Sequence, residues 1–249
     1  MFYGYLKKVC ISLIFLATTI FFFQDGLSAQ TTLNRTGTIK ITLPDSTVLV
    51  IGKDDALPDI PSGSRVEIIS GSLDIGPSAG FIQLVVGDSV ATVKAGDRVT
   101  ASIDPATKME GFKVSAGQIK IITGNTSTTV QTNQEVRISL DKRTGRTEVR
   151  SVKGDIETTT IGVKVMVRQG ADALIDIDPK TRTVHVKSID GDVTVASLDG
   201  KVIRLAKAES TQTEGSVEGE IQTFGEIEAF IPAEEPVEPE RPEASPHRP

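Results

Sequence analysis

A repeat of 37 residues constrains this chain more than any other feature of its sequence. Three aspartates and three glycines recur at that spacing: Asp104, Asp141 and Asp178, and Gly117, Gly154 and Gly191. Each glycine opens a short segment of alternating character, and looser copies of the opening stand at Gly37 and Gly71. A fixed period of this length is typical of supersecondary units that stack on one another.

The units read as β-strands joined by turns. Apolar residues fill every second position in runs such as Val163–Val167, which is the period of a half-buried strand. The run Asp178–Thr181 has turn chemistry, because an Asp side chain can accept a hydrogen bond from the backbone two residues on and Pro presets its own φ. The chain is therefore predicted to be all-β, and its repeated aspartates are predicted to be turn residues.

The alternation breaks just before two of the repeat glycines. Val149 and Val152 are out of phase before Gly154, and Val186 and Ile189 are out of phase before Gly191. The first unit does not show this shift. A shift beside glycine indicates a bulge or corner where the strand turns. Turning strands predict either an elongated β-solenoid-like stack, the favoured interpretation, or a stacked β-sandwich built from units of about 37 residues.

Residues 1–29 are predicted to be an export signal. Lys7 and Lys8 precede an apolar run over 9–23, and small residues at 28–29 resemble a cleavage site. Cleavage near residue 29 would place the mature protein in the periplasm or outside the cell. The alternative is an uncleaved anchor, which would associate the chain with a membrane.

The sole cysteine, Cys10, lies within that signal, so the predicted β-repeat domain over 30–213 contains no thiol. This domain has 22 acidic and 23 basic residues, whereas the chain from Glu214 onward has ten glutamates and two arginines. A nearly neutral body argues against nucleic-acid binding. Residues 232–249, rich in Pro and Glu, are predicted to be a disordered tail, either a solvated spacer or a docking arm. Residues 214–231 alternate enough to be candidate capping strands.

One stretch resembles the FecR family of exported β domains. It has a Gly-x-apolar-x-apolar opening, then a Leu-x-x-Gly-Asp-x-Val step over 84–90, then Gly-Asp-Arg-Val-Thr over 96–100. The resemblance covers roughly residues 37–140. It implies an extracytoplasmic β module that contacts a ligand or a protein, and family members signal across the inner membrane in the regulation of iron uptake.

The sequence predicts no catalytic residue, no metal ligand and no cofactor. His185 alternates onto the polar face of its strand, where a lone histidine is a surface residue, and His247 lies in the tail. Asp176 and Asp178 share one strand face, and Asp190 and Asp192 flank a glycine. A column of the three repeat aspartates could bind Ca²⁺, although turn chemistry explains each of them without a metal.

These observations predict an exported, non-enzymatic β-repeat module that contacts an envelope protein or a polysaccharide. A FecR-like regulatory or sensor subunit acting with a membrane partner is the alternative. A third hypothesis is a polysaccharide-processing enzyme that uses Asp176 and Asp178, because such enzymes work with paired carboxylates.

Overall fold

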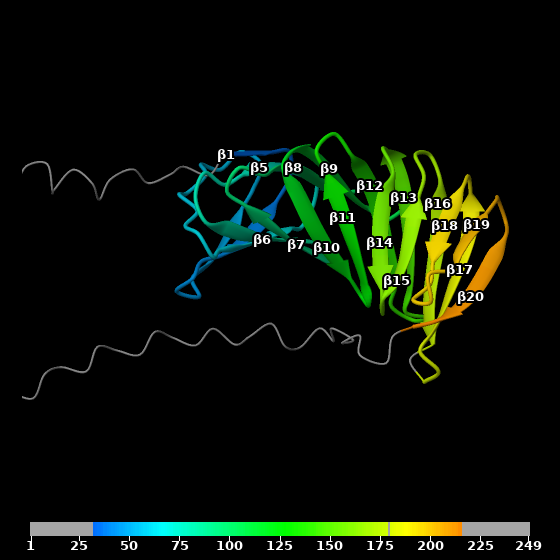
Figure 1. Cartoon of the computed structure of the whole chain (residues 1–249). Coiled ribbons are helices and arrows are strands. Elements are labelled where there is room, and N and C mark those ends of the chain that lie inside the picture. The colour runs from blue at the N-terminus through cyan, green and yellow to red at the C-terminus, as the bar shows by residue number, and fades with distance from the viewer. Residues whose placement is uncertain (1–31, 179, 216–249) are drawn as a thin grey trace, which may run out of the picture.

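The computed structural model describes residues 32–178 and 180–215, which contain 20 strands and no helix. The strands form two facing sheets that together make an elongated, curved stack (Figure 1). Sheet A has the spatial order β1 (Thr32–Arg35), β5 (Ser72–Gly76), β8 (Arg98–Ile103), β9 (Glu110–Ala116), β12 (Glu135–Asp141), β13 (Arg146–Lys153), β16 (Asp172–Asp178), β17 (Thr183–Asp190) and β20 (Ser210–Glu214). Sheet B has the order β19 (Val202–Leu205), β18 (Val193–Ala196), β15 (Val163–Val167), β14 (Ile156–Thr160), β11 (Thr126–Gln131), β10 (Gln118–Thr123), β7 (Ser89–Lys94), β6 (Phe81–Val86), β4 (Arg65–Ile68), β2 (Ile39–Thr42) and β3 (Val48–Ile51).

Each 37-residue unit contributes one hairpin to each sheet. The chain forms β8–β9 in sheet A, crosses to β10–β11 in sheet B, and then repeats the pattern with β12–β13, β14–β15, β16–β17 and β18–β19. Units are added along one axis, as in a solenoid, but their strands pair antiparallel within two facing sheets. The predicted all-β repeat is confirmed, and the stacked sandwich is the form that it takes.

The three repeat glycines occupy the same corner in every unit. Each follows the second strand of a sheet A hairpin and precedes the first strand of the next sheet B hairpin. Their φ angles are +78° at Gly117, +78° at Gly154 and +70° at Gly191, in the left-handed region that side chains with a Cβ rarely adopt. The corner is also crowded, because a Cβ at Gly191 would lie 2.9 Å from the Cα of Ala171.

A β-bulge precedes each of these three corners. The pairing skips one residue at Ser115, at Val152 and at Ile189, which are again 37 residues apart. The sequence revealed two of these bulges, because a valine and an isoleucine disturb the apolar alternation. The first bulge escaped prediction because its extra residue is Ser115, which has no apolar side chain to mark the shift. Bulges increase local twist and bend, which helps the strand turn toward the other sheet.

Upstream of residue 80 the repeat takes a different form. Gly71 precedes β5 of sheet A and Gly37 precedes β2 of sheet B, so the two are not copies of one corner. The next equivalent corner is Gly80, which is 37 residues before Gly117 and has a φ of +63°. Between β4 and β6 the chain adds a single strand, β5, to sheet A, whereas each later unit adds a hairpin of two strands. The chain therefore re-enters sheet B in the direction in which it left, and β4 pairs parallel to β6.

One hydrophobic core lies between the sheets and runs from Ile39 to Leu205. Valine and isoleucine dominate it, and Phe112 is its one aromatic side chain among the described residues. Such β-branched side chains fit a pleated surface and pack between two sheets. At the end of the stack that contains β1 and β3, the Arg35 guanidinium donates to the carbonyls of Gly52 and Asp55. These bonds connect sheet A to the loop after β3.

The signal segment 1–29, the tail 232–249 and most of the candidate capping segment 214–231 lie outside the described residues. Of that last segment, Glu214 ends β20 at the edge of sheet A. Within 32–178 and 180–215, no helix is long and apolar enough to cross a membrane.

We expect Gly191→Ala to lower the free energy of unfolding by about 3 kcal/mol, because it combines a left-handed φ with a clash against the Ala171 backbone. Gly145→Ala is the matched control, since Gly145 has a φ of +75° but nothing within 4 Å of the added Cβ, so it should cost only about 1 kcal/mol. Urea denaturation of both variants measures the difference. Equal losses would show that crowding at the corner is unimportant.

Candidate functional site

The repeat aspartates build turns. The Asp104 carboxylate accepts hydrogen bonds from the amides of Ala106 and Thr107, and Asp178 does the same with Lys180 and Thr181. These bonds, led by the backbone amide two residues on, lower the pKa of each aspartate. At Asp141 the hydroxyl of Thr144 makes the largest contribution to a lowered pKa, followed by the Arg143 amide. The predicted turn role is confirmed.

The repeat aspartates lie in one line along the edge of sheet A where its hairpins turn. Asp104 directly follows β8, and Asp141 and Asp178 end β12 and β16, so the three lie at strands that are two places apart in sheet A, about 10 Å at the usual strand spacing. Each carboxylate is engaged by the backbone amides of its own turn. Within the described ranges, no group of three or more His, Cys, Asp and Glu side chains is placed to hold a metal ion.

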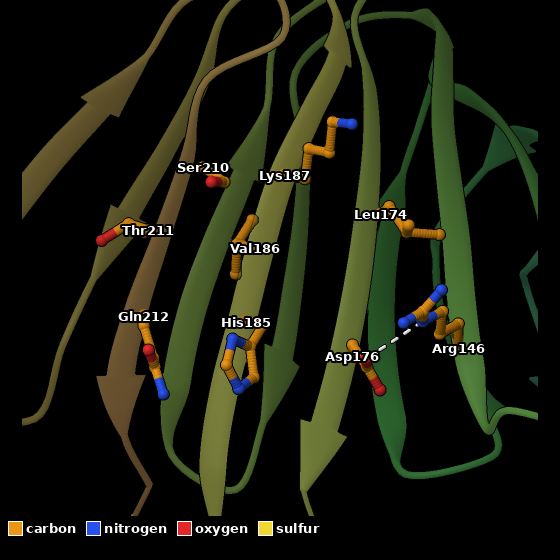
Figure 2. Close-up of a pocket in the computed structure, with 9 residues that line it drawn as sticks. All are labelled: Arg146, Leu174, Asp176, His185, Val186, Lys187, Ser210, Thr211 and Gln212. Atoms are coloured by element: carbon orange, nitrogen blue, oxygen red, sulfur yellow. Dashed lines mark hydrogen bonds and ion pairs between the residues drawn. The ribbon is translucent and has the colours of Figure 1, made fainter.

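The candidate site is a groove on the outer face of sheet A, at the end of the stack that contains β20. It has a volume of about 670 Å³ and is crossed by β13, β16, β17 and β20 (Figure 2). Seven of its nine lining residues are polar or charged: Arg146, Leu174, Asp176, His185, Val186, Lys187, Ser210, Thr211 and Gln212. The groove ends at β20, which is the last strand of sheet A among the described residues.

Four of these side chains form one row across four strands. His185 lies opposite Asp176 on one side and opposite Gln212 on the other. The Arg146 Nε donates to an Asp176 carboxylate oxygen at 3.0 Å, the contact that Figure 2 marks with a dashed line. Directly opposite residues on neighbouring strands have Cβ atoms about 5 Å apart, so the row offers donors and acceptors at a regular interval.

A second row runs beside the first and adds a cation. Lys187 lies between Leu174 on β16 and Ser210 on β20. Among the described residues, no carboxylate lies within ion-pair distance of Lys187, whereas Arg146 is held by Asp176. The groove therefore combines one unpaired ammonium group, one neutralised guanidinium, an imidazole and an amide. Such a lining can hydrogen-bond to a polar chain that lies across the strands.

The sequence placed His185 correctly on the exposed face but did not identify its neighbours. Its partners come from 9 to 39 residues away, and only the pairing register of β13, β16, β17 and β20 brings them together. Asp176 belongs to this row, whereas Asp178 is engaged in its turn. Asp190 pairs with Lys207 at 3.2 Å at the far end of β17, and Asp192 lies beyond it. His247 lies outside the described residues.

Glu110 is a buried acid that sequence reasoning missed. It begins β9 with 3% of its surface exposed, and its Oε1 accepts a hydrogen bond from the Asp88 amide in the β6–β7 turn. Its Oε2 is buried without a hydrogen-bond partner. Burial raises the pKa of Glu110 to about 7, while the Ser89 hydroxyl, the Asp88 amide and the charge of Lys142 oppose that shift.

The motif residues of the FecR resemblance serve the fold. Leu84 and Val90 belong to the β6–β7 hairpin, Gly87 and Asp88 form its two-residue turn, and residues 96–100 make the next corner and enter β8. The same turn position recurs at Gly124 and Ile161, each 37 residues further on. No family model matches this chain, and neither a curated protein nor a solved structure matches it.

Glu110 should make the protein lose stability as pH rises from about 4.5 to 7. In that window the folded chain still holds the Glu110 proton that the unfolded chain has released, so the free energy of unfolding falls with pH. The full loss is about 3 kcal/mol for a shift of this size. Glu110→Gln should remove the decline, and urea melts across the pH range measure it.

The aspartates with lowered pKa values act in the opposite direction and only at lower pH, below about 4, where their protonation costs stability. A wild-type stability that is flat or rising between pH 4.5 and 7 would contradict the assignment of Glu110.

Proposed function

We propose that this protein is an exported, non-enzymatic β-repeat module that contacts an envelope protein or a polysaccharide through the outer face of sheet A. The observation that carries the proposal is the groove across β13, β16, β17 and β20, in which Arg146, His185, Lys187 and Gln212 present hydrogen-bonding groups in two rows. The rows follow the direction that crosses the strands, so they suit an extended chain with repeated polar groups.

The shape of the groove also favours binding over chemistry. It is a shallow surface on rigid strands, and its one close carboxylate, Asp176, is held by Arg146. Asp176 and Asp178 are not presented as a pair, because Asp178 accepts two backbone amides of its own turn. The proposal of a binding module therefore rests on side chains that are arranged to hold a ligand.

A direct test removes the unpaired cation and its neighbour at the sheet edge. Lys187→Ala combined with Gln212→Ala should weaken capture of the envelope ligand by roughly tenfold or more, because a charge-assisted hydrogen bond contributes about 1.5 to 3 kcal/mol. Lys120→Ala is the matched control, since Lys120 is exposed on β10 of the opposite sheet. Binding is measured on envelope extract and on purified envelope polysaccharide, each before and after protease treatment.

Loss of capture in the double variant but not in Lys120→Ala, with unchanged melting temperatures, supports the groove. Binding that survives protease identifies a polysaccharide, and binding that disappears identifies a protein. Equal capture by the double variant and the wild type would contradict the proposed surface.

The second proposal is a regulatory or sensor subunit that acts with a membrane partner, which the FecR-like stretch supports. Cell fractionation with N-terminal sequencing separates the two. The binding module should begin near Gln30 and leave the membrane fraction on washing. A chain that keeps residues 1–29 and stays membrane-bound would favour the regulatory subunit.

A further inference from the structure

Strand β3 is an edge strand without the usual protection. The described part of the chain has four edge strands: β1, β3, β19 and β20. β1 carries Asn34 and Arg35, β19 carries Arg204, and β20 is polar throughout. β3 has the sequence Val-Leu-Val-Ile, with no polar or charged side chain. Natural edge strands are usually blunted by charges, prolines or bulges, because an open edge pairs with other strands.

The open hydrogen-bonding groups of β3 belong to its two exposed valines. The Leu43 amide donates to the Thr47 carbonyl where the β2–β3 hairpin begins. In an antiparallel ladder, bonded residues alternate, so Leu49 and Ile51 bond to β2 while Val48 and Val50 point their amides and carbonyls away from it. The side chains of Val48 and Val50 are 52% and 61% exposed.

We propose that β3 pairs antiparallel with β3 of a second copy of this chain, with Leu49 opposite Leu49. Side chains alternate between faces, so a two-fold pairing that keeps the core side and the outer side continuous must be centred on a residue. Centring on Leu49 sets Val48 opposite Val50 of the second copy, and Val50 opposite its Val48. All the amides and carbonyls that these valines leave open then find partners, and the valines cover one another on the outer face.

Self-complementarity favours a second copy as the occupant, because Val48 and Val50 supply both the open amides and carbonyls and the exposed apolar side chains that an antiparallel copy of the same strand would satisfy. The nearest charged residues in the chain, Asp45 and Lys53, lie in the turns that flank β3 and not on the strand, and the Asp45 carboxylate accepts a hydrogen bond from the Thr47 amide of its own turn. Both side chains are exposed, and neither forms an ion pair within the described residues. No charged side chain therefore lies within the paired residues 48–50 of either copy. Sheet B becomes continuous through the dimer, which is the isologous contact of a two-fold assembly.

Cysteine cross-linking tests the register on the full chain with Cys10→Ser, which leaves the introduced thiol as the only one. Directly opposite residues of a non-hydrogen-bonded pair have Cα atoms about 4.5 Å apart, which suits a disulfide. Leu49→Cys should therefore form a disulfide-linked dimer under mild oxidation. Val50→Cys should link roughly tenfold more slowly, because residue 50 is diagonal to its own copy at about 7 to 8 Å.

Exposure alone predicts the reverse order of cross-linking rates for Leu49→Cys and Val50→Cys, so the two variants distinguish the proposed register from random collisions. Val50 is more exposed than Leu49, so random collisions between monomers would link Val50→Cys faster. Faster linking of Leu49→Cys supports the proposal. Faster linking of Val50→Cys, or linking of neither, would overturn it.

A charge on the edge tests the dimer without a thiol. Val50→Lys should shift the chain to monomer in sedimentation velocity runs over a range of concentrations. Val202→Lys is the matched control, because Val202 is 63% exposed on β19 at the opposite edge of the same sheet, and it should leave the dimer intact. A Val50→Lys variant that still associates like the wild type, or a wild type that is monomeric throughout, would overturn the proposal.

Discussion

The glycine corner between the sheets is the constraint on which the rest of this structure depends. At each corner the backbone must adopt a left-handed φ while it passes close to the end of the loop that led from sheet B into the same sheet A hairpin, and glycine alone meets both conditions without strain. The corner sends the chain from sheet A to sheet B after every second strand. Because it recurs at a constant interval, the hairpins of both sheets advance together and the two inner faces stay in contact.

The lean core follows from this arrangement. Each hairpin needs to bury only one face, so alternating valine and isoleucine suffice and large aromatic side chains have little room. The core is continuous, but each unit contacts chiefly its neighbours, which is the property that allows repeat proteins to grow by addition of units. The side chains on the outer faces of the sheets do not pack in the core, so their identity can vary. The groove lies on the outer face of sheet A.

Most of the fold could be predicted from local sequence patterns. The candidate site could not, because it depends on the pairing register of strands that are distant in the sequence. The spacing of Gly117, Gly154 and Gly191 indicated the units, and Asp104 and its equivalents indicated the turns. Gly80 could have been recognised, since it opens the same Gly-x-apolar-x-apolar pattern one period upstream. The bulge at Ser115 and the burial of Glu110 could not, because a polar side chain at those positions leaves no mark on the apolar period. The row of Arg146, Asp176, His185 and Gln212 depends on which strands become neighbours, and no local pattern reports that.

The most direct measurement of the central claim is the removal of one whole unit. Deleting residues 118–154 joins Gly117 to Asp155 and recreates the corner that Gly154 forms with Asp155, while two strands leave each sheet. The shortened chain should keep its β-sheet circular dichroism and unfold in a single cooperative urea transition. Deleting residues 118–134 takes two strands from sheet B alone and should abolish that transition. If both deletions unfold alike, or if the whole-unit deletion cannot fold, the claim that equal units build both sheets together is contradicted.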